Sequence, residues 1–366
     1  MAMTRVKVIL PERSYDAVIE NGLLTRAGAQ LRGVLGERRH LFVVTVAPVR
    51  RRWGSKLMKS LAAAGFDATF VEMPNGERYK RLATIELLSE KMTRLGADRR
   101  AVVLAFGGGV VGDVAGMLAS VYMRGVDLVQ IPTTVQAQVD ASVGGKTGVN
   151  LRTGKNLVGT FYQPLAVLLD PAVLSTLSER EFRAGMYEAL KDGVIGSPEL
   201  FHLLEKTRIG KLRQDAKALE WVIAESVRLK AEVVSADERE GGLRRVLNFG
   251  HTIGHALETA TGYKHFLHGE AVAWGMIAAA RIAGVVGRLD KVSEKRIREA
   301  VLGFGSLPPV NVRNGSVVQL LKSDKKTSDG IVHFVLPREI GKVEIVNDVP
   351  EKVVTEAVEE LRRMSK

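Results

Sequence analysis

Short apolar runs rich in valine and isoleucine alternate with helical patterns through the first half of the chain, and this alternation is what most constrains the fold. The runs cover residues 6–10, 41–46, 68–72, 101–106, 127–131 and 166–169. Strands separated by helices are typical of a largely parallel sheet. We therefore predict an α/β N-terminal domain with a largely parallel, Rossmann-like sheet.

The second half of the chain has a different pattern. From about Leu174 the segments are long and helical, with one strand-like stretch at 331–336 that precedes a turn at Gly341. A chain of 366 residues is long enough for two domains with separate cores. We place the boundary near Asp170 and Pro171, which predicts an α/β domain over residues 1–171 and a mainly α-helical domain over residues 172–366. A functional site is expected in a cleft between them.

The composition is that of a folded protein, because 46% of the residues are hydrophobic and 26% are charged. Lysine and arginine number 53 against 41 acidic residues, and the net charge of +12 indicates an anionic partner. The absence of cysteine excludes disulfides and thiolate chemistry, so metal binding would fall to histidine and carboxylate. The N-terminus lacks a signal-peptide core and the longest apolar run, 271–280, is well short of the ~18 residues of a membrane span, so we expect a cytoplasmic protein without membrane partners.

A glycine-rich turn, GGGVVG at residues 107–112, follows one apolar run and precedes a helical pattern. Glycines there let the backbone approach a diphosphate, whose charge the free N–H groups and the helix dipole stabilise. Gly107, Gly109 and Gly112 match the dinucleotide fingerprint, but position 132 is proline where an acidic residue is usual. The motif is therefore either a diphosphate-binding turn or a tight strand-helix turn without a ligand.

The loop-prone stretch 131–156 is rich in hydroxyl, amide and ammonium groups. Such groups at glycine-relaxed positions form a surface suited to polyols and phosphates, and a merely solvated loop is the alternative. The stretch is not a P-loop: it contains the terminal Gly145-Lys146-Thr147, but Asp140 stands where the first glycine would be required. Nucleoside triphosphate hydrolysis is therefore disfavoured.

Lys230 falls within the apolar stripe of a helix predicted over residues 215–236, so its side chain points inward. Its amine could reach water past a packed stem, or it could be aimed into the cleft between the domains. The helix pattern leaves both interpretations open.

Three histidines and one glutamate are candidate metal ligands. His251 and His255, in the segment LNFGHTIGHALE, are spaced i, i+4 and share a helix face, while His268 stands at a turn or helix start. With Glu188 added, two histidines and one glutamate would match an open catalytic zinc site, and structural histidines are the alternative. The HExxH pattern of metalloproteases is absent, because Thr252 follows His251.

Several motifs, taken in order, resemble those of the 3-dehydroquinate synthase family: GGGVVGD, YMRG, IPTT, DASVGGKTGVN, GKNLVGTFYQP, LNFGHTIGHALE, HGEAV and DKK. The match runs from about Asn75 to Lys326. The resemblance implies an NAD-dependent and zinc- or cobalt-dependent enzyme of the shikimate pathway, expected to be a homodimer. Such enzymes convert a sugar phosphate, 3-deoxy-D-arabino-heptulosonate 7-phosphate, into 3-dehydroquinate and phosphate.

The resemblance also implies roles for individual residues. The implied metal ligands are Glu188, His251 and His268. The implied NAD contacts are Asn75, Gly76, Glu77, Lys80, Gly109, Gly112, Asp113, Thr133, Thr134, Thr176, Lys146 and Lys155, of which the last two lie where nicotinamide and substrate meet. The implied substrate contacts are Asp140, Asn156, Lys191, Lys230, Arg244, Asn248, His255, Lys325 and Lys326, with Arg124 reaching the neighbouring subunit's site.

Two positions depart from the family's pattern. Val46 stands where an aspartate or asparagine often contacts the adenosine ribose, so we expect weaker or differently arranged adenosine binding. Tyr187 stands beside Glu188 where a small residue is usual, and we expect altered packing behind the metal.

Three other functions compete with this interpretation. Another sugar-phosphate cyclase, making a cyclitol, would leave Arg244 and Lys230 without a carboxylate to pair with, which is costly for desolvated cations. A dehydrogenase of the iron-alcohol or glycerol type would release NADH and would not need the lysines of GKN and DKK. A basic nucleic-acid binder is disfavoured, because the basic residues lie scattered without interleaved aromatics, which make up only 5% of the chain.

Overall fold

The computed structural model describes residues 3–36, 40–312, 317, 319–321 and 332–365. It contains two compact units. Unit 1 comprises Met1–Leu177 and Ala216–Arg239, and unit 2 comprises Ser178–Asp215 and Glu240–Lys366. The segment 216–239 thus belongs to unit 1, although it lies well past the boundary that the sequence pattern placed after residue 171.

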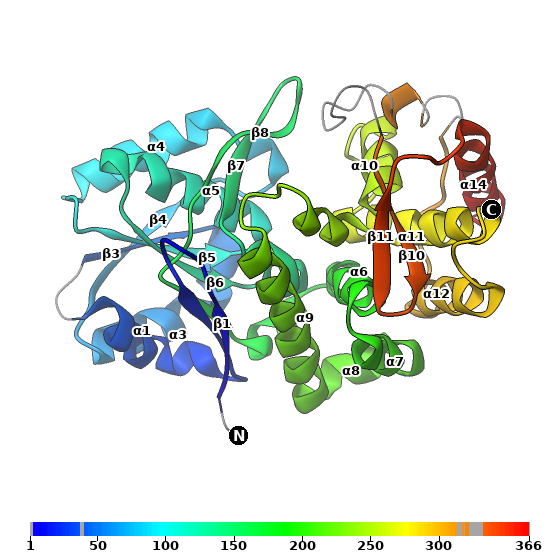
Figure 1. Ribbon diagram of the computed structural model, residues 1–366. Helices are drawn as coiled ribbons and strands as arrows, with labels where there is room; N and C mark the ends of the chain where they lie inside the picture. Colours follow the sequence, from blue (N-terminus) through cyan, green and yellow to red (C-terminus); the bar gives the residue numbers. More distant parts are fainter. Residues whose placement is uncertain (1–2, 37–39, 313–316, 318, 322–331, 366) are drawn as a thin grey trace. The chain divides into compact units, whose positions relative to one another are not determined.

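A seven-stranded sheet forms the centre of unit 1 (Figure 1). Its strand order is β1-β2-β9-β6-β5-β3-β4, and every neighbouring pair is parallel except β1 and β2. The predicted α/β class with a largely parallel sheet is confirmed, and each predicted apolar run overlaps a strand, whereas β2 was not predicted. The strands are β1 (Thr4–Val8), β2 (Tyr15–Ile19), β3 (His40–Thr45), β4 (Asp67–Glu72), β5 (Val102–Gly107), β6 (Asp127–Pro132) and β9 (Ala166–Leu169).

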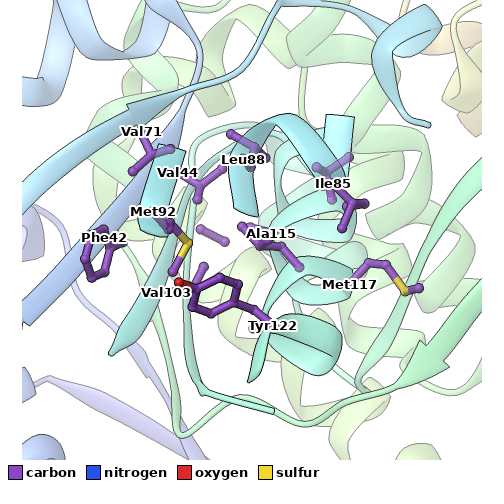
Figure 2. Packing of buried hydrophobic residues seen from close by; sticks show 14 of the residues in the cluster. Phe42, Val44, Val71, Ile85, Leu88, Met92, Val103, Ala115, Met117 and Tyr122 are labelled. Atoms are coloured by element: carbon purple, nitrogen blue, oxygen red, sulfur yellow. The ribbon is translucent and has the colours of Figure 1, made fainter. Parts of the chain in front are cut away.

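Helices cover both faces of this sheet. On one face α1 (Ala27–Leu35) packs with α3 (Ser55–Ala63), and on the other lie α4 (Leu82–Arg94) and α5 (Gly109–Val121). Figure 2 shows the core beneath α4 and α5, where Phe42 and Val44 of β3 belong to one buried cluster with Leu88 and Met92 of α4. Because both faces are buried, the strands are continuous apolar runs, which is why they stand out in the sequence.

The rest of unit 1 includes a hairpin inside the stretch that the sequence analysis took for a loop. Strands β7 (Lys146–Leu151) and β8 (Gly154–Phe161) form it, and β7 packs on α5. Gly116 permits this contact, since a Cβ there would lie 2.5 Å from Cγ2 of Thr147. Helix α9 (Ala216–Ala236) packs on β1 and on η5. The short helical elements are α2 (Ala47–Val49), η1 (Leu23–Arg26), η2 (Arg50–Gly54), η3 (Glu77–Tyr79), η4 (Tyr122–Arg124), η5 (Ala137–Ala141) and η6 (Pro171–Thr176).

Unit 2 is mainly helical, as predicted. Its hairpin of β10 (Phe334–Glu339) and β11 (Lys342–Val346) turns at Gly341, close to the strand predicted over 331–336, of which residue 331 lies outside the described part of the chain. The helices are α6 (Glu179–Ile195), α7 (Pro198–Lys206), α8 (Ile209–Gln214), α10 (His251–Ala260), α11 (His268–Val285), α12 (Lys291–Gly303) and α14 (Glu351–Met364), with η7 (Leu243–Asn248) before α10.

Helix α11 lies at the centre of unit 2, in contact with α6, α10, α12 and α14. It contains the longest apolar run of the sequence, 271–280, every residue of which is buried. Helix α6 begins at a capping box, in which the Ser178 hydroxyl accepts from the backbone N–H of Glu181 and the Glu181 side chain accepts in return from the Ser178 N–H. Among the described residues, no helix combines the length and apolar character needed to cross a bilayer.

Candidate active site

Three histidines of unit 2 lie together. His251 and His255 are on α10 and His268 is the first residue of α11, and one ring nitrogen from each lies within 4.8 Å of the others. Glu188 of α6 joins them, because its Oε1 is 3.2 Å from Nε2 of His268 and 3.8 Å from Nε2 of His251. The structure thus brings together the three residues that the resemblance implied as metal ligands, and places His255 beside them.

Glycines allow the three helices to approach closely enough for this cluster to form. A Cβ on Gly275 of α11 would lie 1.8 Å from the carbonyl oxygen of Gly250, at the start of α10. A Cβ on Gly269 would lie 1.8 Å from the carbonyl oxygen of Ala184 in α6. The backbones are therefore in direct contact: the start of α10 lies against the middle of α11, and the start of α11 lies against α6.

The electrostatics of the cluster suit a cation. Burial opposes ionisation of Glu188, but the charge of Lys191 and the hydrogen bond and charge of His268 hold its pKa well below the ordinary value. Burial lowers the pKa of His251 to about 4, which leaves this imidazole neutral at pH 7. Burial also acts to lower the pKa of His268, but hydrogen bonds to Glu188 and Glu258 raise it to about 10. A divalent ion would take the place of the proton on Nε2 of His268.

The donor set fits a divalent metal ion. Glu188 is fully buried, Nζ of Lys191 lies 2.9 Å from its Oε2, and Nε2 of His268 lies 3.2 Å from its Oε1. A buried carboxylate beside imidazole nitrogens is the kind of site that zinc and related ions occupy. The structure supports a site built on Glu188, His251 and His268, with His255 within reach.

A second group of predicted residues lies beyond the carboxyl ends of the strands of unit 1. Nζ of Lys80 lies 2.5 Å from Oδ2 of Asp113 on α5 and 2.5 Å from Oδ1 of Asn156 on β8. Asn150 ties the hairpin to the same loop, since its amide donates to Oε1 of Glu77 at 2.7 Å and its backbone N–H donates to the Lys80 carbonyl. The loop after β4, the first turn of α5 and the hairpin thus form one polar surface.

The glycine turn at 107–109 joins β5 to α5 at this edge. Helix α5 begins at Gly109 with Gly108 as its N-cap, and in the described structure no side chain caps it. A Cβ on Gly108 would lie 3.0 Å from Cγ2 of Thr134, in the loop after β6, so the two strand ends are in close contact. Uncapped N–H groups at a helix start at the carboxyl edge of a parallel sheet form a phosphate-binding arrangement.

Other predicted residues of unit 1 have clear partners. Lys230 of α9 contacts Asp140 of η5, whose Oδ1 lies 2.6 Å from Nζ. Thr176 accepts a hydrogen bond of 3.1 Å from Nε1 of Trp53. Lys146 begins β7 with an exposed side chain, and Lys155 lies half-buried in β8.

In unit 2, the guanidinium-bearing side chain of Arg244 on η7 is buried, and Nδ2 of Asn248 lies 3.4 Å from Oε1 of Glu240. Lys191 is buried beside Glu188. Lys325 and Lys326 lie outside the described residues.

The two departures from the family's pattern have structural counterparts. Val46 is buried in the hydrophobic cluster of Figure 2 and caps α2 without a side-chain hydrogen bond. Tyr187 is fully buried and its ring stacks on Phe304 with centroids 5.3 Å apart.

Sequence reasoning missed one residue of the cluster. Glu258 of α10 is buried, and its Oε2 lies 3.2 Å from Nδ1 of His268. The signal was present, because Glu258 ends the motif LNFGHTIGHALE, one helical turn beyond His255. Its partner, His268, lies ten residues further on, and no local pattern indicates that pairing.

Comparison with known families gives a consistent result. Residues 70–184 match the model described as 3-dehydroquinate synthase N-terminal, and residues 185–327 match its C-terminal counterpart. The chain is 54% identical over 363 residues to the 3-dehydroquinate synthase of Koribacter versatilis (strain Ellin345), covering 99% of both chains. It is 48% identical over 349 residues to that of Solibacter usitatus (strain Ellin6076), covering 95% of this chain and 96% of the relative.

Solved structures of related enzymes share the fold. One is ValA, a 2-epi-5-epi-valiolone synthase from Streptomyces hygroscopicus subsp. jinggangensis 5008 with NAD+ and Zn2+ bound, at 34% identity and a TM-score of 0.87 over 97% of this chain and 99% of that one. Another is a 2-deoxy-scyllo-inosose synthase complexed with carbaglucose-6-phosphate, NAD+ and Co2+, at 28% identity and a TM-score of 0.88 over 98% and 100%. A probable glycerol dehydrogenase from Sinorhizobium meliloti 1021, at 16% identity and a TM-score of 0.60 over 100% of this chain and 99% of that one, shares the fold alone.

Proposed function

The chain belongs to the 3-dehydroquinate synthase family, and from this premise we propose that it converts 3-deoxy-D-arabino-heptulosonate 7-phosphate into 3-dehydroquinate and phosphate. The cofactors are NAD and a divalent metal ion, zinc or cobalt. The observation that carries the proposal is the convergence of the buried carboxylate of Glu188 with Nε2 of His251 and of His268.

The cofactors and this chain's residues have separate tasks. When bound, NAD supplies a reversible hydride acceptor and the metal ion a Lewis acid that polarises a substrate oxygen. Glu188, His251 and His268 hold the metal. Burial of Glu188 strengthens the charge interactions that it makes, while His255 and His268 remain partly exposed on the side open to a ligand. His255, beside the three ligands, is placed to move a proton to or from the substrate, and the substrate's own phosphate is the second candidate for proton transfer.

The polar surface of unit 1 is the proposed nucleotide site. The turn at 107–109 and the first turn of α5 receive the diphosphate. Lys80 and Asp113 form an ion pair of 2.5 Å at its border, which orients both side chains. The remaining proposed NAD contacts are those that the resemblance implied: Asn75, Gly76, Glu77, Thr133, Thr134, Lys146, Lys155 and Thr176.

Basic residues are the proposed anchors for the substrate's two anionic groups. Arg244, a planar five-donor fork, and Lys230 bind the carboxylate. Lys146, Lys155 and Asn156 bind the phosphate, together with Lys325 and Lys326. This assignment explains why the chain buries a cation as large as Arg244.

The rival functions are those of a cyclitol-forming cyclase and of a dehydrogenase. The solved structures with these functions are less similar in sequence to this chain than the 3-dehydroquinate synthases are. The solved cyclases match at 34% and 28% identity, against 54% for the dehydroquinate synthase of Koribacter versatilis. A dehydrogenase is supported by fold alone, at 16% identity.

We further infer a homodimer located in the cytoplasm. Met123 and Arg124 have successive positive φ values of 47° and 69°, a backbone conformation that residues other than glycine rarely adopt. The exposed apolar side chains of Val121, Met123 and Phe161 lie near this bend, where Ser120 and Thr160 are hydrogen-bonded at 2.9 Å. A second copy covering this face would stabilise the bend. Light scattering should report a dimer that Phe161→Glu dissociates.

The test of function is product analysis. Purified protein with the heptulosonate phosphate, NAD and Zn2+ or Co2+ should release phosphate and form 3-dehydroquinate without net NADH absorbance. Net NADH would instead identify a dehydrogenase, and a cyclic product without a carboxylate would identify a cyclitol synthase. Glu188→Gln should abolish turnover. Glu220→Gln, which alters a buried carboxylate that accepts from the Asn21 N–H in unit 1, should leave turnover unchanged.

A further inference from the structure

His268 bridges two buried carboxylates. Its Nε2 lies 3.2 Å from Oε1 of Glu188 on α6, and its Nδ1 lies 3.2 Å from Oε2 of Glu258 on α10. Glu258 is 4% exposed, which makes its carboxylate expensive to bury unless it serves a partner. The proposed mechanism gives Glu188 a task and gives Glu258 none.

The chemistry of imidazole defines what Glu258 can do. A neutral imidazole carries one N–H and one lone pair, and the partner of one nitrogen decides which nitrogen keeps the proton. Glu188 and Glu258 are both carboxylates and accept only, so without a metal ion each ring nitrogen of His268 carries a proton. When an ion replaces the proton on Nε2, Glu258 keeps the one on Nδ1. The lone pair of His268 is then on Nε2, on the side of Glu188.

His251 is oriented in the same way by a different group. Its Nδ1 lies 3.1 Å from the backbone carbonyl oxygen of Phe249, which also accepts only. Its Nε2 therefore carries the lone pair, and it lies 3.8 Å from the same oxygen, Oε1 of Glu188, that Nε2 of His268 contacts. Both histidines thus direct their lone pairs to one point, one through a neutral carbonyl and the other through a charged carboxylate.

We propose that Glu258 is a positioning residue for the metal ligand His268: its carboxylate accepts from Nδ1–H, fixes the ring's orientation and tautomer, and increases the donor strength of Nε2. The inference rests on the proposed function, because it assumes that the cluster binds a divalent ion. Outer groups of this kind contribute about 10- to 100-fold to metal affinity in other proteins. Helix α10 therefore supplies one proposed metal ligand, His251, and through Glu258 orients a second one, His268.

Metal affinity tests this role without recourse to turnover. Co2+ is titrated into metal-free full-length protein, the visible absorption of the bound ion is recorded, and the Kd is measured by competition with a chelator. Glu258→Ala should raise the Kd for Co2+ by about 10- to 100-fold. Glu258→Gln, whose amide oxygen still accepts from Nδ1–H but has no charge, should raise it less, by about 3- to 10-fold, with a spectrum close to that of the wild type.

The controls separate positioning from simple structural support. Glu220→Ala removes a buried carboxylate of unit 1 and should leave the Co2+ Kd unchanged. A Glu258→Ala protein with lower thermal stability but wild-type Co2+ affinity would overturn the proposal. If Glu258→Ala does not fold, a wild-type Kd in Glu258→Gln would overturn it equally. If the wild type binds no Co2+ at all, the proposed function itself fails together with this inference.

Discussion

Nζ of Lys230 lies 2.6 Å from Oδ1 of Asp140, and it also donates to the backbone carbonyl of Asp140, ninety residues earlier in the chain. The lysine side chain is 8% exposed and the aspartate side chain 26%. The inward lysine of α9 is therefore not a snorkelling residue whose amine ends in water. Its amine is bound to η5, and it holds that turn against α9 within unit 1.

We expect Lys230→Met to lower the free energy of unfolding by about 2–3 kcal/mol, because it leaves the Asp140 carboxylate partly buried without its cation. Asp140→Asn should add little to this loss in the double variant, which a cycle of urea unfolding experiments can measure. Lys59→Met, at an exposed position of α3, is the control and should change stability by less than about 0.5 kcal/mol. Additive losses from the two substitutions would contradict a direct interaction.

The contact between α10 and α11 leads to a second prediction. Gly275→Ala places a methyl group against the Gly250 carbonyl, which can be relieved only by separating the two helices. We expect the free energy of unfolding to fall by about 3 kcal/mol or more, with weaker Co2+ binding. Gly33→Ala, in α1 with open space around the added Cβ, should instead stabilise by about 0.5–1 kcal/mol. Calorimetry measures both, and equal effects of the two changes would refute the close-packing argument.

The hydroxyl of Tyr187 is buried without a hydrogen-bond partner among the described residues, and burial raises the pKa of this group, so it remains neutral. Tyr187→Phe keeps the ring on Phe304 and removes the unsatisfied oxygen, so the free energy of unfolding should rise by about 1 kcal/mol. In the matched control Tyr162→Phe, the lost hydroxyl donates to the Val126 carbonyl at 2.8 Å, and stability should fall by about 1 kcal/mol. Chemical denaturation reports both, and a loss in Tyr187→Phe would contradict the prediction.

Asp290 gives a prediction about pH. Its side chain caps α12 by accepting from the N–H groups of Val292 and Ser293, and hydrogen bonds from the Ser293 side chain and backbone lower its pKa below the ordinary value. A lowered folded pKa means that the ionised cap stabilises the protein above the unfolded pKa of about 3.9 and that this contribution is lost as pH falls through the folded pKa.

The stability difference between wild type and Asp290→Ala should therefore be constant from about pH 5.5 to 8 and shrink below about pH 4. Asp290→Asn also caps a helix but does not titrate, so its difference from Asp290→Ala should not vary with pH. Midpoints of urea unfolding measured over this pH range test the prediction. A stability difference between wild type and Asp290→Ala that widens toward low pH would contradict a lowered pKa of Asp290.

Much of the fold was predictable because burial on both faces of a parallel sheet demands continuous apolar strands. Strand β2 escaped prediction, since it is a short edge-proximal strand, YDAVI, with a charged residue. The hairpin β7–β8 was taken for a loop because its glycines and polar residues are typical of loops. Two of the glycines are instead required by the close approach of the two strands, because a Cβ on Gly159 would lie 2.0 Å from the Thr147 carbonyl oxygen and one on Gly148 would lie 3.0 Å from that of Val158.

The sequence by itself determined the kinds of chemistry available: histidines at i, i+4, a glycine turn after a buried strand, inward cations and no thiol. Periodicity and residue type depend only on residues that are close together in the sequence, so the sequence alone reveals them. Only the tertiary structure decided that Glu258 contacts His268 and that the amine of Lys230 binds Asp140. It also decided that α9 is part of unit 1, whereas the helices before and after it are part of unit 2. Each of these depends on distances of a few ångström between segments remote in sequence or on opposite sides of a turn, and such distances are set by helix packing, which no local pattern encodes.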